Sequence, residues 1–484
     1  MVSIDGTILN VALPTISNAL HTTSAQLIWI NSAYIIILGS TILLGGSLGD
    51  KYGRKWFLLL GLLVFVTGSV WAGLSTKAYS LILARGFMGV GGGLIMPATL
   101  SLITNIFPDQ ERAKAIGVWA GMAGIGVAIG PLAGGLLLTW FYWGSVFFVN
   151  VPVAAIGVIA VWRLVPNSKS SDSPPLDLVG AAISFVGLLA LFFGLIRGPD
   201  RGWSDPGVIA AFVLAAVLLV LFVLLELRKS NPLLDVRFFK IPEFASGVIS
   251  IAIGFFALFG LIYVLTIYIQ IVLSYSPMEA GLALLPFALV LLVGSPMVPR
   301  LVKWLGGRTV VALGLLVIAS GMMVFRFVTT STTYPLILAG LVLVSAGMAM
   351  AQVPSSDAIM GSIPRDRAGE GSATNAAIRQ IGSSLGIALI GGISSLGYRV
   401  VLSKTSAFQA LSGTAAQQAE SGLNGALAVS QGMGNSGADL ANAAKTAFTR
   451  GLDASMILTA VIAFIGAVIA YRFIPRKPTP TAGR

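Results

Sequence analysis

The chain has 484 residues, of which 56% are hydrophobic and only 10% are charged. Soluble domains carry a charge on about a quarter of their residues, so this composition excludes a soluble globular protein, and the absence of cysteine excludes a disulfide framework. Apolar stretches of about 20 residues, the length that crosses a bilayer as a helix, recur along the whole sequence. They predict an all-α polytopic membrane protein rather than a β-barrel of short alternating strands.

We predict fourteen transmembrane spans, with approximate limits 1–19, 28–49, 56–75, 79–105, 114–139, 142–164, 178–196, 207–227, 244–271, 280–302, 309–329, 334–360, 372–397 and 453–474. We expect a few residues of the first span's cytoplasmic end to be missing from this start. The connection 398–450 is rich in Ala, Ser, Gly, Gln and Asn. That composition suits short amphipathic helices and a flexible extracellular loop about equally.

Basic residues fix the expected orientation. Of the 30 Lys and Arg, 20 lie in the loops after even-numbered spans or in the C-terminal tail, and 8 lie on the opposite side. The positive-inside rule therefore predicts that both termini are cytoplasmic. The same bias accounts for the net charge of +12, so we expect a partner in the anionic lipid surface and none in nucleic acid.

An internal repeat divides the spans. At an offset of 253, Gly53, Gly61 and Gly68 recur as Gly306, Gly314 and Gly321; at an offset of 256, Gly126, Gly130 and Gly135 recur as Gly382, Gly386 and Gly391. We therefore predict a six-helix bundle over 1–164, two additional spans over 178–227, and a second six-helix bundle over 244–474, an arrangement of 6 + 2 + 6. Parallel halves of this kind are typical of secondary transporters, whose substrate site lies between the halves near mid-membrane. The alternative is a packed bundle without a pathway.

The loop GGSLGDKYGRK joins the second and third spans on the predicted cytoplasmic side. Its glycines permit a tight turn and a close approach of helices; they are Gly46, Gly49 and Gly53. Asp50 can pair with nearby bases or lie against a helix N-terminus, and we expect Arg54 and Lys55 to anchor the turn at the lipid headgroups. The basic residues alone also suit an ordinary loop. The complete spacing resembles the signature loop of the major facilitator superfamily, which in that family latches the two halves together.

Arg85 lies within the fourth span, in LILARGFMGVGGGLIMP. An arginine inside a span costs about 2.5–3.5 kcal/mol on insertion scales, so Arg85 needs a polar neighbour or a wet cavity. Snorkelling of its side chain to the outer surface is the alternative. The stretch resembles the fourth-helix motif of the same superfamily, which implies a role for Arg85 in proton transfer.

The fifth span contains GMAGIGVAIGPLAGG. Small residues at a spacing of four make a helix face on which another helix packs closely, and a proline weakens the helix beside them. The residues concerned are Gly126, Gly130, Pro131, Gly134 and Gly135. Simple helix packing accounts for part of this pattern. The order G-x-x-x-G-P-x-x-G-G also resembles the antiporter motif of drug exporters in the superfamily, which implies export rather than uptake.

The opening MVSIDGTILNVALPTI resembles the first-helix motif of the fourteen-span drug:proton antiporters (QacA/EmrB type), and with WINSAYIIILGS and NAAIRQIGSSLGIAL the resemblance runs over nearly the whole chain. It implies that Asp5 is a proton or cation site, whereas a solvated acid near the cytoplasmic mouth is the alternative. At a rise of 1.5 Å per residue, Asp5 lies roughly 21 Å below the outer end of its span and Arg85 roughly 9 Å below. We therefore expect Asn10, rather than Asp5, to be the partner of Arg85.

Asp357 is a second acid within a span, near its cytoplasmic end, where it can join the coupling site or simply face water. Candidate cavity residues are aromatic, amide or basic side chains within spans, each of which alone is more often a packing residue: Trp29, Asn31, Tyr34, Trp119, Tyr263, Gln270, Gln352 and Arg379. Aromatic side chains suit lipophilic cations. The carboxylates with which family members export dications have no counterpart in the thirteenth span, so monocations, zwitterions and neutral amphiphiles stay open.

The sequence has no metal-ligand cluster, no nucleophile beside a base and no phosphate-binding loop, so we expect no enzyme activity and no cofactor. The resemblance implies a proton-coupled multidrug efflux antiporter that exports lipophilic, cationic compounds across the bacterial cytoplasmic membrane by alternating access, as a monomer. Export of an endogenous metabolite, lipid or peptide is the alternative. A non-transporting membrane sensor is a third possibility, which the retention of Asp5 and Arg85 disfavours.

Overall fold

The computed structural model describes residues 1–484 except 23, 169–176, 230–231, 435–436 and 475–484. In the described residues the chain is helical, without strands, and 13 helices are long and apolar enough to cross a membrane. The predicted all-α class is confirmed. The remaining predicted span, 1–19, coincides with helix α1 (Val2–Leu20), whose described apolar stretch, Val11–Leu20, is shorter than a full span.

The helices follow the predicted spans in order. The first part comprises α2 (Ser24–Tyr52), α3 (Arg54–Gly73), α4 (Ala78–Ile106), α5 (Asp109–Trp140), the short α6 (Ser145–Phe148), α7 (Asn150–Leu164), α8 (Leu178–Arg201) and α9 (Pro206–Arg228). The second part, after the turn η1 (Val236–Lys240), comprises α10 (Pro242–Ile267) with its continuation η2 (Tyr268–Val272), α11 (Pro277–Gly294), η3 (Ser295–Met297), α12 (Val298–Leu305), α13 (Gly307–Phe325), α14 (Tyr334–Gly361), η4 (Arg365–Arg367), α15 (Ala368–Leu402) and α19 (Gly437–Phe473).

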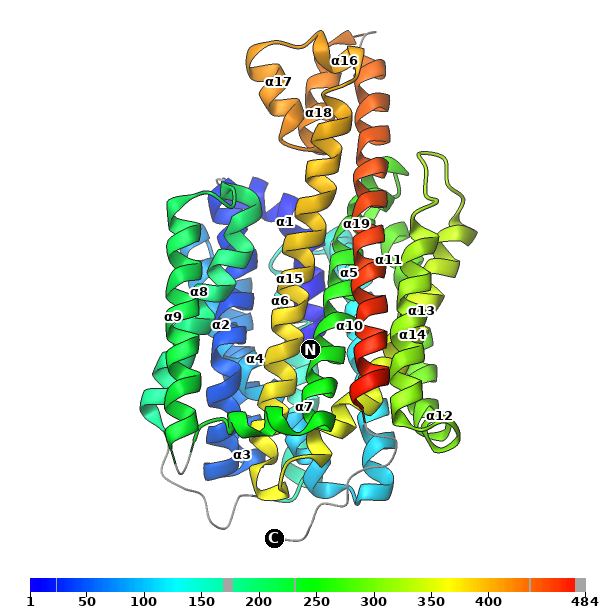
Figure 1. Ribbon diagram of the computed structural model, residues 1–484. Coiled ribbons are helices and arrows are strands. Elements are labelled where there is room, and N and C mark those ends of the chain that lie inside the picture. The colour runs from blue at the N-terminus through cyan, green and yellow to red at the C-terminus, as the bar shows by residue number, and fades with distance from the viewer. Residues whose placement is uncertain (23, 169–176, 230–231, 435–436, 475–484) are drawn as a thin grey trace.

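The connection 398–450 is largely helical. Helices α15 and α19 rise above the rest of the bundle, and the short helices α16 (Ser406–Gln409), α17 (Gly413–Glu420) and α18 (Leu423–Gln431) fold against them as a cap (Figure 1). The hydroxyl of Tyr398 on α15 donates a hydrogen bond of 2.9 Å to the carbonyl of Ala419 on α17. Of the two alternatives for this segment, short helices are therefore correct. We call the cap's end of the molecule the upper end and the end with α12 the lower end.

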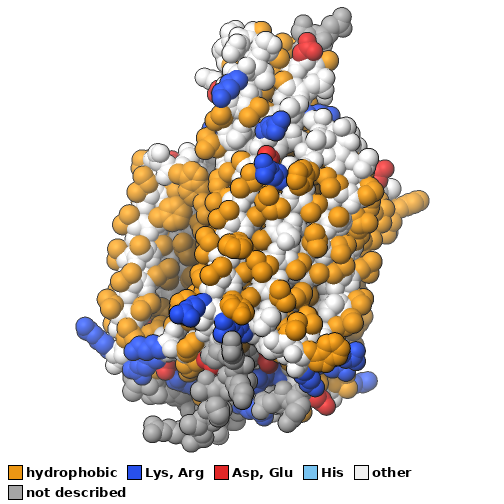
Figure 2. All heavy atoms as spheres, turned by 45° about the vertical axis from the view of Figure 1, so that its right-hand side comes forward, with side chains coloured by type: hydrophobic (Ala, Val, Ile, Leu, Met, Phe, Trp, Pro, Cys, Tyr) orange, Lys and Arg blue, Asp and Glu red, His pale blue; other side chains and the backbone are white. Residues whose placement is uncertain are grey.

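The outer surface matches a lipid environment. Hydrophobic side chains cover the middle of the face in Figure 2, and Lys and Arg side chains gather along its lower rim. Helix α9 is an example, because Val213, Val217 and Val220 are each 57–58% exposed on it. Exposure of this kind is unfavourable in water and neutral against lipid tails.

The glycines that recur at the offset of 253 occupy equivalent positions in the two parts of the chain. A Cβ at Gly61 would lie 3.1 Å from the carbonyl oxygen of Gly91, where α3 packs on α4; a Cβ at Gly314 would lie 2.8 Å from that of Gly347, where α13 packs on α14. Gly53 and Gly306 precede α3 and α13 with φ of 112° and 81°, a backbone region that glycine enters without steric cost. These contacts support the interpretation that the chain contains a duplicated unit.

Two large clusters of buried side chains form the core. One comes from α10 to α19, and the other comes from α1 to α9 together with part of α15. The two parts of the chain meet where α2 crosses α15 and where α5 runs beside α11, and α8 packs against both α2 and α15. The interior between these contacts contains the polar residues described next.

Candidate functional site

Asp5 and Arg85 form a buried ion pair between α1 and α4. The Arg85 Nη1 atom lies 2.5 Å from the Asp5 Oδ2 atom, and the two residues are 1% and 0% exposed. The Arg85 Nε atom also donates to the carbonyl of Ile30 at 3.2 Å, and the guanidinium lies 4.5 Å from the centre of the Tyr34 ring. Each charge is therefore compensated, as a buried ion requires, and snorkelling of Arg85 to the surface is excluded.

This pair corrects the expectation that Asp5 and Arg85 lie too far apart for contact. The depth calculation assumed that the upper ends of α1 and α4 are level, and their contact shows that they are not: α1 rises farther beyond Asp5 than α4 does beyond Arg85. It also neglected the reach of a long arginine side chain. The side chain of Asn10, the expected partner of Arg85, lies outside the described residues.

Asn150 and Ser69 extend the site, and the sequence reasoning missed both. The Asn150 Nδ2 atom lies 3.4 Å from the Asp5 Oδ1 atom and 3.0 Å from the Ser69 hydroxyl oxygen. Ser69 in turn donates to the carbonyl of Phe147 at 2.8 Å. Asn150 and Ser69 are 1% and 0% exposed. A lone amide in the otherwise apolar stretch 145–161 was the available signal for Asn150.

Helix α1, which carries Asp5, is held by the glycines of α5. A Cβ at Gly126 would lie 2.8 Å from the Cβ of Ser3, and one at Gly130 would overlap the Thr7 hydroxyl. A Cβ at Gly134 would lie 3.0 Å from the Ile8 side chain, whereas a Cβ at Gly135 would meet nothing within 4 Å. The predicted close packing is therefore confirmed for the first three glycines.

The opposite side of α5 contacts the second part of the chain. A Cβ at Gly117 would lie 2.7 Å from the carbonyl oxygen of Ser295 in η3, and one at Gly121 would lie 2.9 Å from the Cα of Leu292 on α11. Farther up, Pro131 packs beside Gly281 of α11. Helix α5 therefore touches both α1 and α11 through residues without bulky side chains.

The loop between α2 and α3 joins the two parts of the chain at the lower end. Asp50 pairs with Arg54 at 2.6 Å and accepts hydrogen bonds of 2.8 and 3.0 Å from the backbone N–H of Gly369, in the first turn of α15. Arg54 donates to the carbonyl of Arg365 at 3.0 Å and is 1% exposed, so the expectation that it anchors the turn at the lipid headgroups is wrong. Both expected partners of Asp50, a base and a helix N-terminus, are thus present. Of the predicted glycines, Gly46 lies directly against Gly369, Gly49 has room around it, and Gly53 forms the turn into α3.

Further polar contacts close the same end. Asp357 on α14 pairs with Arg112 on α5 at 2.7 Å, so Asp357 is a bridging residue rather than an acid that only faces water. Asp235, just before η1, lies 3.6 Å from Arg367, and its backbone N–H donates to Glu370 at 3.3 Å. We call the contacts of Asp50, Arg54, Asp357 and Asp235 the lower latch.

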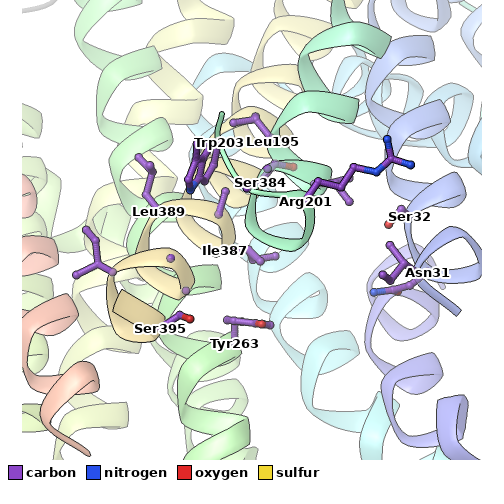
Figure 3. Close-up of a pocket in the computed structure, with 18 of the residues that line it drawn as sticks. Asn31, Ser32, Leu195, Arg201, Trp203, Tyr263, Ser384, Ile387, Leu389 and Ser395 are labelled. Carbon is purple, nitrogen blue, oxygen red and sulfur yellow. The ribbon is translucent and has the colours of Figure 1, made fainter. Parts of the chain in front are cut away.

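A cavity of about 870 Å³ opens above the latch. Figure 3 shows Asn31 and Ser32 on α2 facing Ser384 and Ile387 on α15, with Trp203 and Arg201 entering from the end of α8. The cavity extends upward to the level of the cap, since Ser421 also lines it. Among its described lining residues the charged ones are Arg201 and Arg399, and none is acidic.

The predicted cavity residues divide into three groups. Asn31 and Tyr263 line the cavity. Tyr34 belongs to the Asp5–Arg85 site, Trp29 stacks with Arg197 at 5.2 Å, and Gln270 lies in η2, outside the cavity lining. The third group is the set of Trp119, Gln352 and Arg379, which are packed between α5, α14 and α15; the Arg379 guanidinium lies 4.7 Å from the centre of the Trp119 ring.

Several relatives carry names that refer to drug export. The multidrug resistance protein Stp of Mycobacterium tuberculosis is 34% identical over 394 residues, which cover 81% of this chain and 73% of that protein. The multidrug efflux pump LfrA of Mycolicibacterium smegmatis is 32% identical, over 97% of this chain and 93% of that protein. The tetracenomycin C resistance and export protein of Streptomyces glaucescens is 29% identical, over 81% and 73%.

Solved structures share the fold. The human organic anion transporter MFSD10 (TETRAN) superposes with a TM-score of 0.59 at 13% identity, covering 97% of this chain and 98% of that one. A bacterial homologue of the human lysosomal transporter Spinster, inward-facing and unoccupied, superposes with a TM-score of 0.58 at 21% identity. The match covers 97% of this chain and 93% of that one. Residues 1–387 match the sequence profile of the Major Facilitator Superfamily. The chain belongs to the Major Facilitator Superfamily, whose members are transporters rather than enzymes.

Proposed function

We propose that the chain exports lipophilic small molecules in exchange for protons, as a fourteen-span transporter of 6 + 2 + 6 arrangement with α1 as the first span and both termini in the cytoplasm. The observation that carries the proposal is the buried Asp5–Arg85 pair, a carboxylate held on a helix that packs against α5, which in turn contacts α11 in the other half. The names of relatives at 29–34% identity, which are multidrug efflux and antibiotic resistance proteins, support the direction of transport and the kind of cargo.

The coupling step is a change in the charge of Asp5. While Asp5 is ionised, it binds Arg85 and holds α1 to α4. A proton that enters from outside neutralises the carboxylate and weakens this link, and the freed Arg85 keeps its contacts with Ile30 and Tyr34. Helix α1 then moves with α5, which packs on α11 in the other half. Such a step biases a two-state bundle by the difference in proton affinity between its two states.

The conformation fits the outward-facing half of this cycle. The latch at the lower end, which we assign to the cytoplasmic side, is closed by Asp50, Arg54 and Asp357. The cavity opens above it, towards the cap. Opening the latch and closing the cavity would expose the interior to the cytoplasm, which is the alternation that transporters of two parallel halves perform.

Export can be tested in a bacterial host that lacks its own drug pumps. We expect expression of the chain to lower the accumulation of some members of a panel of cationic dyes, fluoroquinolones and tetracyclines, relative to the empty vector. An uncoupler should abolish the difference, because the proton gradient drives the exchange. Unchanged accumulation of the whole panel, or export that persists in the uncoupled cells, would overturn the proposal.

A further inference from the structure

Arg379 is a buried cation without a counter-charge among the residues that the structure describes. It lies on α15 and is 7% exposed, yet its Nε and Nη1 atoms have no hydrogen-bond partner among the described residues, and it forms no salt bridge with them. Its guanidinium lies between two aromatic rings, 4.7 Å from the centre of Trp119 on α5 and 4.4 Å from that of Phe255 on α10. These rings hold the group in place but accept none of its hydrogen bonds.

The embedded acids are not available to Arg379. Asp5 is paired with Arg85, and Asp357 is paired with Arg112. An arginine within the membrane is costly unless it finds a partner or faces water, and an uncompensated buried charge is costlier than a buried pair. As far as the chain is described, the interior between the halves therefore has an excess positive charge at Arg379, which an anionic group entering the site would neutralise.

A second unsatisfied donor lies alongside. Asn375 on α15 donates to the hydroxyl of Ser356 on α14 at 2.9 Å. Arg379 and Gln352 each lie four residues above that contact, about one turn, on the same faces of the two helices. The Nε2 atom of Gln352 also has no acceptor within the described part of the chain. Two helices therefore present N–H groups of a cation and an amide without acceptors, and oxygen atoms of an acid satisfy such donors best.

The cavity that lies above Arg379 has the same polarity. Ser384 lines the cavity five residues above Arg379 on α15, a rise of about 7.5 Å. The charged residues that line the cavity within the described part are Arg201 and Arg399, and Figure 3 shows the Arg201 side chain extending across it towards α2. Trp203 and Tyr263 contribute aromatic surface. Such a lining favours entry of an amphiphile with a negative group.

We propose that Arg379, assisted by Gln352, binds an acidic oxygen group of the transported molecule, and that the cargo consists of amphiphilic carboxylates, including zwitterions that contain one. This inference rests on the proposed function, because it assumes that the chain transports a small molecule. It replaces the expectation, based on the aromatic residues, that the cargo is cationic. Trp119 and Phe255 then serve both partners: they stack on the guanidinium and contact the apolar part of the cargo.

The test uses three probes that share one apolar group and differ in charge: 1-pyrenebutanoate, its neutral amide, and the corresponding trimethylammonium compound. The purified full-length chain is titrated with each, and binding is followed by energy transfer from tryptophan to pyrene. We expect the carboxylate to bind about tenfold or more tightly than the amide, since a charge-assisted hydrogen bond is at stake, and the cation to bind weakest. Equal affinities, or a preference for the cation, would overturn the proposal.

Variants assign the preference to Arg379. R379Q should remove the advantage of the carboxylate over the amide, R379K should keep part of it, and Q352L should reduce it less. R450Q removes an exposed arginine from α19 and serves as the matched control, with the wild-type preference expected. If the preference survives in R379Q, then Arg379 is only a hydrated structural cation and the proposal is wrong.

The binding assay needs no proton gradient, so its outcome is separate from the export test. A carboxylate preference that depends on Arg379 in a chain that exports nothing would refute the proposed function and keep the site. Export that is driven by the proton gradient, with no preference for the carboxylate, would support the proposed function and refute the site at Arg379. The melting temperature of each variant shows whether it is folded. If R379Q is unfolded, R379K decides the case, because a carboxylate preference equal to that of the wild type would contradict the proposal and a reduced preference would support it.

Discussion

Replacing Gly46 by alanine should open the lower latch. Gly46 lies where α2 crosses α15, and an added Cβ would be 2.5 Å from the carbonyl oxygen of Gly369 and 2.6 Å from the Cβ of Ala373. Ordinary contact begins at 3.4 Å, and both neighbours are fixed to the helix backbone. The two helices must therefore separate by roughly 1 Å at this point.

The separation acts on the hydrogen bonds that cross the same interface. The bond from the Gly369 N–H to Asp50 is 2.8 Å long and that from Arg54 to the Arg365 carbonyl is 3.0 Å, so an added 1 Å stretches both beyond hydrogen-bonding distance. Bonds to charged groups contribute about 1.5–3 kcal/mol each, and water that enters the open latch replaces part of that. We expect a net shift of about 1–3 kcal/mol, or about 5- to 150-fold in the ratio of closed to open latch.

Cysteine labelling can measure this ratio, because the chain has no cysteine of its own. Ser101 is a suitable reporter position: it is 1% exposed on α4, between Pro97, which accepts from Ser372, and Asn105, which donates to Arg365. In inside-out vesicles, a membrane-impermeant maleimide should label S101C faster when Gly46 is alanine. Gly307→Ala is the control, since a Cβ there meets nothing within 4 Å. Equal labelling rates in the two backgrounds would refute the reasoning.

Three further predictions follow from single contacts. Gly130→Ala should destabilise the folded chain by about 1–3 kcal/mol, because the added Cβ would overlap Thr7. The control Gly135→Ala should leave the melting temperature in detergent unchanged. Equal effects of the two substitutions would contradict the packing of α1 on α5. Asp357→Asn should keep drug-driven proton movement in vesicles and change the rate of latch opening modestly, since its pair with Arg112 is partly exposed; loss of proton movement would make Asp357 a coupling residue. Lys229→Met should lower the melting temperature near neutral pH, because it removes the ion-pair partner of Asp177 and of Glu226. Burial alone would raise the pKa of Asp177 and lower that of Lys229. The Gly180 N–H and Lys229 nevertheless hold the pKa of Asp177 below its usual 3.8, and Asp177 raises the pKa of Lys229 above its usual 10.5. The stabilisation is therefore present above the usual carboxyl pKa and below the usual lysine pKa, and the difference from wild type should shrink as the pH falls through the lowered pKa of Asp177; a difference that stays constant in strong acid would exclude the pair as its cause.

The sequence predicts the helices well because hydrocarbon thickness sets their length. Predicted limits such as 79–105 and 334–360 differ from α4 and α14 by at most one residue at each end. The glycine spacing also predicts packing, since Gly126, Gly130 and Gly134 leave room for a neighbour whatever its sequence. Helix length and glycine spacing depend only on a single helix and its solvent, so one sequence is enough to predict them.

Contacts between helices were harder to predict. The distance between Asp5 and Arg85 depends on how far α1 and α4 are staggered, which no spacing within either helix records. Asn150 completes the site from a third helix for the same reason. The cap 398–450 was ambiguous because its helices are short and polar and take their stability from contacts such as that of Tyr398 with Ala419.

Arg379 is a residue that the sequence identifies correctly but whose electrostatic surroundings the sequence does not show. Its presence in a span marks it as functional, and the sequence predicts it as a cavity residue. Its lack of a counter-charge among the described residues depends on every helix around it, so the sequence alone favours the commoner expectation of cationic cargo. The packing of α5, α10 and α15 about Arg379 is the basis on which we propose an anionic rather than a cationic cargo.

Proton coupling through Asp5 is tested most directly in proteoliposomes that contain a pH-sensitive dye. A compound from the export panel is added and the resulting proton movement is recorded for the wild type and for Asp5→Asn, whose side chain keeps the shape but does not titrate. We predict that the compound drives proton movement through the wild type and none through Asp5→Asn, although both bind it. Full cargo-driven proton movement in the variant would show that another group carries the proton.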